Sequence, residues 1–160
     1  MSNDASLREH LINVLDWKSA HADFDAAIGR ISPGKRGQRP ESLPYSPWEL
    51  LEHMRIAQRD ILEFCQSSDY TQPDWPAEYW PVSAEPPTAA AGDESIGVLR
   101  DDRDGMKDIV RNTPDLYAEI PHGDGQTYMR EVLLVADHNA YHLGQLVTVR
   151  RLLGEWGSGA

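Results

Sequence analysis

Residues 46–66 read SPWELLEHMRIAQRDILEFCQ, and this stretch carries the clearest helix signal in the chain. Ser46 can cap the helix, Pro47 suits its first position, and the Glu49 side chain can reach back to the amide of the cap residue. Apolar residues then recur at helical spacing: Leu50, Met54, Ala57, Ile61 and Phe64. The stretch therefore predicts an amphipathic helix that ends near Gln66.

Three further segments repeat this helical spacing of apolar residues, at about 6–30, 93–112 and 127–153. The segment 93–112 has the weakest pattern, because Gly97 and Gly105 each cost about 1 kcal/mol relative to alanine inside a helix. No run alternates apolar and polar residues over the length of a strand. Four amphipathic helices are enough for a bundle, so the sequence predicts one all-α domain.

The connection between the second and third predicted helices, residues 67–92, is long for a compact domain, where most loops have about 4 to 6 residues. It contains PDWP at 73–76 and YWP at 79–81, so it is aromatic and stiff rather than a flexible linker. We expect an ordered crossover whose aromatic rings close over one end of the bundle. Covering only the flank of the bundle is an equally open alternative, because pocket walls and core caps use the same residue types. The rings concerned are those of Trp75, Tyr79 and Trp80.

The charge balance and the single cysteine argue against several classes of function. The chain has 15 Lys and Arg against 26 Asp and Glu, a formal net charge of -11, which repels nucleic acid and anionic lipids.

Cys65 is the only cysteine, so an intramolecular disulfide and a Cys-based zinc site are excluded, and we expect it to act as a small apolar side chain. Residues 1–8 lack a signal-peptide pattern, and the apolar stretch 132–136 is too short to span a bilayer. We therefore expect a cytoplasmic protein without a nucleic-acid or membrane partner.

The sharpest local feature is HNAYH at residues 138–142. His138 and His142 are four apart, so in a helix their imidazoles share a face and can converge on one metal ion, with Zn–N distances of about 2.0 to 2.1 Å. This pair alone supports metal binding and ordinary core or surface histidines about equally. Asn139 stands where the His-Glu-x-x-His motif has its catalytic glutamate, which argues against a thermolysin-like protease.

His53 is the best candidate for a third ligand, because it lies between Leu50 and Ala57 on the inward side of the predicted second helix. A single imidazole on an apolar stripe is more often a hydrogen-bonded core residue than a ligand. Two further imidazoles facing it across a bundle favour the ligand interpretation. Asp60, two turns further along the same helix, is another candidate for the inward face.

Three other residues are candidates for the surroundings of the site. His21 lies on an apolar stripe, and a fourth ligand, an acid–base group and a buried structural histidine are all open roles for it. Metal-bound histidines usually donate their second ring N–H to a carboxylate or carbonyl, and Asp137 or Gln145 could accept it. Gln145 is one turn beyond His142 on the same side, whereas Asp137 is one position off the ligand face.

Two stretches of the chain resemble motifs of the DinB/YfiT-like family. SPWELLEHMRIAQRD at 46–60 resembles the motif of the second helix, and DHNAYHLGQ at 137–145 resembles that of the fourth. The YWP segment at 79–81 is also similar to members of the family. The resemblance covers essentially the whole chain, and it implies a single DinB-like domain over residues 1–160.

The resemblance implies an up-down four-helix bundle with a long ordered crossover between helices 2 and 3. One histidine of the second helix and two of the fourth hold a divalent metal ion in this family. Here the resemblance implies that His53, His138 and His142 bind one ion, with nickel or zinc expected.

Characterised members of the family include transferases that use low-molecular-weight thiols such as bacillithiol and mycothiol, and members are often dimers. The resemblance therefore implies a homodimeric metal-dependent enzyme, either a thiol S-transferase or a hydrolase, that acts on a small-molecule substrate. The alternative is a non-catalytic metal- or ligand-binding module with a stress-related role. No catalytic residue is assigned.

Overall fold

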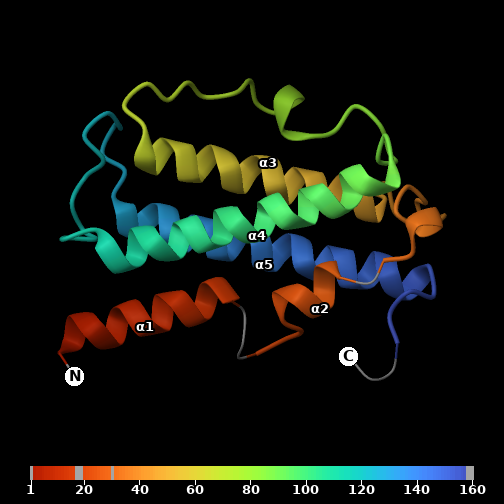
Figure 1. Cartoon of the computed structure of the whole chain (residues 1–160), viewed down its shortest axis with the longest axis horizontal. Helices are drawn as coiled ribbons and strands as arrows, with labels where there is room; N and C mark the ends of the chain where they lie inside the picture. The colour runs from red at the N-terminus through yellow and green to blue at the C-terminus, as the bar shows by residue number, and fades with distance from the viewer. Residues whose placement is uncertain (1, 17–19, 30, 158–160) are drawn as a thin grey trace.

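The computed structural model describes residues 2–16, 20–29 and 31–157. Over these ranges the chain forms five α-helices and no strand, which confirms the predicted all-α class (Figure 1). The helices are α1 (Asn3–Asp16), α2 (Phe24–Ile28), α3 (Pro47–Gln66), α4 (Ala89–Asn112) and α5 (Tyr128–Leu152). Two short 3-10 helices, η1 (Pro33–Lys35) and η2 (Ala77–Tyr79), lie in the connections. Within the described residues, no helix is both long and apolar enough to cross a membrane.

Helices α3 and α4 run in the same direction and are joined by the long crossover (Figure 1). The Gln58 amide donates to the Leu99 carbonyl at 2.8 Å, and further along both helices Leu62 packs against Gly105. The predicted strict up-down alternation is therefore not confirmed. A short loop forces neighbouring helices to be antiparallel, whereas the crossover is long enough to return the chain to the end where α3 began.

The prediction of one continuous helix over 6–30 is wrong, because the chain forms α1 and α2 as separate helices. The Asp23 carboxylate accepts a hydrogen bond from the Ala26 amide at 2.7 Å and so caps the start of α2. Arg150 satisfies the other end of this short helix by donating to the carbonyls of Ala26 and Ala27, each at 2.7 Å. Trp17 and Arg30, which the prediction included, lie outside the described residues.

The other predicted helices are present with small shifts. The capping box of α3 forms as predicted, with Ser46 and Glu49 each bonded to the other's backbone amide. Helix α4 begins at Ala89, earlier than the predicted 93, because the Thr88 hydroxyl accepts from the Ala91 amide at 3.0 Å. Gly154, with φ +74°, follows the end of α5 as predicted.

The apolar core fixes the inward faces of α3 and α5, which carry the predicted ligands. Leu50 and Met54 of α3 and Leu146 of α5 have 0 % exposure, and Leu143 has 2 %. Burying each of these side chains contributes about 1.5 to 3 kcal/mol. Because His53 stands between Leu50 and Met54 in the sequence, their burial also turns its side chain into the bundle.

Candidate metal centre

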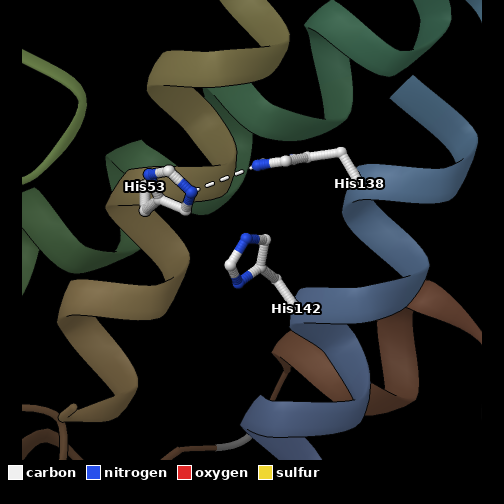
Figure 2. Close-up of side chains that lie close together, drawn as sticks. All are labelled: His53, His138 and His142. Atoms are coloured by element: carbon white, nitrogen blue, oxygen red, sulfur yellow. Dashed lines mark hydrogen bonds between the residues drawn. The ribbon is translucent and has the colours of Figure 1, made fainter. Parts of the chain in front are cut away.

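Three histidines from two antiparallel helices meet inside the bundle (Figure 2). His53 comes from α3, and His138 and His142 come from successive turns of α5. One ring nitrogen of each can be chosen so that all three lie within 4.8 Å of one another. No cysteine or carboxylate among the described residues joins this cluster. The sequence prediction that these three rings converge is confirmed.

The Nδ1 atoms of two rings are engaged in hydrogen bonds that direct Nε2 to the centre. His53 Nδ1 donates to the main-chain carbonyl of Tyr79 at 2.8 Å, and His142 Nδ1 donates to Oε1 of Gln145 at 2.7 Å. Because an oxygen of this kind accepts, each Nδ1 carries the proton and each Nε2 keeps its lone pair. This is the arrangement in which imidazoles are held when Nε2 is to bind a metal.

A buried row of amides orients the third ring, His138. The Gln58 amide donates to the Leu99 carbonyl at 2.8 Å, and its oxygen accepts from the Asn139 amide at 2.7 Å. This order leaves the Asn139 oxygen facing His138 Nδ1 at 3.5 Å. Gln58 and Asn139 are 1 % and 0 % exposed, so their hydrogen bonds are protected from water. The row therefore offers Nδ1 of His138 an acceptor when Nε2 binds a metal. Without a metal, Nε2 of His138 can instead donate to the free Nε2 of His53, 3.1 Å away (Figure 2).

All three imidazoles have a pKa below the usual value for histidine. Burial is the main cause for each ring. It lowers the pKa of His138 to about 4, with smaller contributions from His142 and His53, and that of His142 to about 4, with a contribution from His53. Burial also lowers the pKa of His53, against the opposing effect of the Tyr79 carbonyl. At neutral pH the rings are therefore uncharged, which is the form that binds metals.

The cluster fits a divalent transition-metal ion. Two nitrogens that each lie about 2.1 Å from one ion are about 3.0 to 3.4 Å apart. Nε2 of His53 and Nε2 of His138 are 3.1 Å apart. Imidazole ligands without a carboxylate suit zinc, nickel, copper or iron better than magnesium or calcium. The donor set and the spacing of this pair therefore fit a divalent transition-metal ion, the class that includes the predicted nickel and zinc.

As predicted, aromatic rings of the crossover lie at the histidine cluster. The crossover runs along α3, however, and the cluster lies partway along the bundle rather than at one end (Figure 1). The Trp80 ring stacks flat on His53, with centroids 3.9 Å apart and planes 2° apart, and Tyr45 stacks against Trp80 at 5.0 Å. The Trp75 centroid is 6.5 Å from that of His53, and the Tyr79 ring packs against Trp75 at 5.0 Å. Trp75 is 66 % exposed, so this part of the cover also faces solvent.

Of the three residues proposed for the surroundings, Gln145 alone contacts a ring of the cluster. His21 is exposed, and its Nδ1 lies 3.0 Å from the carbonyl of Ala22. His21 lies in the bend before α2 and not on the inward face of a continuous helix, so its side chain is not directed towards the three histidines. Asp137 is also exposed and lines an apolar surface pocket with His21. Neither residue is brought into the cluster.

Sequence reasoning missed the contacts that hold His53. Any residue could supply the Tyr79 carbonyl, so no side-chain pattern could identify it. The YWP segment at 79–81 indicated that aromatic rings pack on the bundle, but it did not indicate that Trp80 stacks on His53. Asp60 is half-buried and faces the crossover, where it binds the hydroxyls of Tyr70 and Tyr79 rather than the histidines.

A helical bundle that gathers three neutral histidines from two facing helices defines a class of candidate metalloprotein. Comparison with known protein families matches residues 16–146 to the DinB superfamily. This match covers most of the chain, which therefore belongs to the DinB superfamily. No curated protein and no solved structure matches the chain.

Proposed function

We propose that the chain is a divalent-metal-binding protein in which His53, His138 and His142 hold one ion, nickel or zinc. The observation that carries this proposal is the convergence of three uncharged imidazoles, which no carboxylate of the described residues joins. Membership of the DinB superfamily supports it independently.

We further propose that the ion serves catalysis rather than structure alone. Three protein ligands leave a coordination position for water or substrate. An ion held there would lower the pKa of a bound thiol or water, and so would supply a nucleophile at neutral pH. His138 is half-buried, whereas His53 and His142 are buried, so its side of the cluster is the less covered one.

A pocket of about 290 Å³ beside the cluster supports a small substrate. Tyr45, Tyr141 and Gln145 contribute to its lining, and Gln145 also binds His142. That volume is just below the range for small-molecule sites, about 300 to 1,000 Å³, so it suits only a small ligand. We therefore propose a metal-dependent enzyme that acts on a small molecule, either a low-molecular-weight-thiol S-transferase or a hydrolase.

The competing proposal is a non-catalytic metal- or ligand-binding module with a stress-related role. We also keep as proposals a cytoplasmic location, a homodimeric state, and the absence of nucleic-acid and membrane partners. The last of these is supported by the formal net charge of -11, which repels phosphate groups.

A reaction panel tests the enzyme proposal. The metal-loaded protein is incubated with electrophiles and several low-molecular-weight thiols, and separately with hydrolysable esters and amides, each with and without a chelator. We expect turnover of at least one pair that the chelator abolishes and added metal restores. Full metal occupancy with no turnover across the panel would favour the binding module.

A further inference from the structure

Asp60 connects the crossover to α3, the helix that carries His53. It lies about two turns after His53, and its two carboxylate oxygens have different partners. The Tyr70 hydroxyl donates to Oδ1 and the Tyr79 hydroxyl donates to Oδ2, both at 2.6 Å. Hydrogen bonds this short to a carboxylate are among the stronger ones in proteins. Asp60 therefore fastens two separate points of the crossover to the helix.

Tyr79 is held by Asp60 at its hydroxyl and contacts His53 at its backbone. Its carbonyl accepts the His53 Nδ1–H bond at 2.8 Å, and the next residue, Trp80, stacks on the same imidazole at 3.9 Å. Tyr79 is only 5 % exposed, so its ring has little freedom between these two attachments. Burial and the Asp60 carboxylate raise the pKa of both tyrosine hydroxyls, which keeps them protonated as donors.

We propose that Asp60 is a positioning residue for the metal centre, because it holds Tyr79 where the carbonyl of that residue selects the Nδ1–H tautomer of His53. Nε2 of His53 is thereby kept free and aimed at His138. The bond of Tyr70 to the same carboxylate serves as an internal comparison. Tyr70 packs on Phe64 at 5.2 Å, at the other end of α3 from His53, and so fastens the crossover without orienting the ring.

Three conservative variants test whether Asp60 orients the His53 ring or only attaches the crossover to α3. They are Asp60→Asn, Tyr79→Phe and Tyr70→Phe. The asparagine keeps the size of the side chain but has one acceptor oxygen and no charge. One tyrosine hydroxyl therefore loses its acceptor, and the other keeps only an uncharged one. Each phenylalanine removes one hydroxyl and leaves the backbone carbonyl in place. Two quantities are measured: the Zn²⁺ affinity, by competition with a chromophoric chelator, and the tautomer of His53 in the metal-free protein, by ¹⁵N NMR of the imidazoles.

We expect Asp60→Asn and Tyr79→Phe to lower the Zn²⁺ affinity about tenfold, the lower end of the effect of removing groups that support a ligand. Both should also reduce the population of the Nδ1–H tautomer of His53, and Tyr70→Phe should change neither quantity by more than about twofold. Wild-type affinity and tautomer in both Asp60→Asn and Tyr79→Phe would overturn the proposal. Equal effects of Tyr70→Phe and Tyr79→Phe would overturn the route through Tyr79.

The inference rests on the proposed metal site, but its failure can be told from a failure of that site. If the wild-type protein binds no Zn²⁺, the metal proposal fails, and the tautomer of His53 still decides the role of Asp60. If Zn²⁺ binds and neither Asp60→Asn nor Tyr79→Phe changes the tautomer of His53, the metal site stands. Asp60 then only attaches the crossover to α3.

Discussion

The imidazole of His53 lies flat against the indole of Trp80, with ring centroids 3.9 Å apart and planes 2° apart. The stack covers one face of His53, and a hydrogen bond to the Tyr79 carbonyl holds its edge. His53 is 2 % exposed as a result, although the crossover that covers it has little regular structure. The crossover is therefore part of the site and not only a connection between α3 and α4.

Replacing Trp80 by leucine should affect both stability and metal binding. The stack on His53 and the packing on Tyr45 would be lost, and we expect the free energy of unfolding to fall by about 2 to 3 kcal/mol. The metal affinity should fall as well, because His53 gains rotational freedom. Trp75→Leu is the matched control, since Trp75 is 66 % exposed and should change stability by less than about 0.5 kcal/mol. Equal losses in urea unfolding for both variants would contradict the assigned roles.

Gln145 should matter for metal affinity through its bond to His142. Gln145→Leu removes the acceptor of the His142 Nδ1–H and should weaken metal binding by about 10- to 100-fold. Gln145→Glu keeps an acceptor there and should restore most of the affinity. Tyr141→Phe removes only the Tyr141 hydroxyl, which accepts from the Gln145 amide at 3.3 Å, and should leave affinity near wild type. Titration calorimetry that ranks the leucine and glutamate variants together would refute this role.

Asn139 and Gln58 should behave as a coupled pair. Asn139→Leu leaves the Gln58 oxygen buried without its donor, which should cost about 1 to 3 kcal/mol of unfolding free energy. Adding Gln58→Leu removes the unpaired group, so the double variant should lose less than the sum of the two single variants. A double-mutant cycle by chemical denaturation measures this coupling. Strict additivity would show that the bond between Asn139 and Gln58 contributes no pairwise stabilisation.

The stability of the metal-free protein should depend on pH through the histidine cluster. The pKa of His138 and of His142 is lowered to about 4, mainly by burial, while an unfolded histidine titrates near 6.5. Below pH about 6.5 the unfolded chain therefore binds protons that the folded protein does not. The stabilisation is fully present above that pH and is lost as pH falls to about 4, by up to roughly 3 kcal/mol for each ring.

Urea unfolding of the metal-free protein at several pH values measures this dependence. The double variant His138→Gln/His142→Gln is the control, because it keeps every carboxylate that also titrates in acid. The difference between the wild type and this variant should shrink as pH falls from 6.5 to 4. A difference that does not change with pH would contradict the lowered pKa of the two rings.

Local signals in the sequence predicted the parts of the fold that carry the ligands. The Ser46 capping box and the spacing of His138 and His142 act within one or two helical turns, so both can be identified without tertiary structure. The break between α1 and α2 was missed, because Asp23 is compatible both with a polar helix face and with a helix cap. The contact that Arg150 makes with the end of α2 favours the cap, and this tertiary contact cannot be identified from local sequence.

The direction of α4 and the support of His53 depend on contacts that sequence spacing does not encode. A long crossover permits either direction for the helix that follows it, and the parallel packing of Gln58 on Leu99 decides between them. The carbonyl of Tyr79 has no side-chain signature. Asp60 was expected on the inward face, but its use by two tyrosines depends on the path of the crossover.

Metal content per chain, measured by elemental analysis on protein dialysed against nickel or zinc and then against buffer, tests the central claim most directly. We predict about one ion per chain for the wild type and for His21→Ala, whose exposed imidazole lies outside the cluster. We predict loss of that ion in His138→Ala, because two imidazoles cannot replace the three-nitrogen site. Full occupancy in His138→Ala, or none in the wild type, would contradict the assignment of His53, His138 and His142 as the metal ligands.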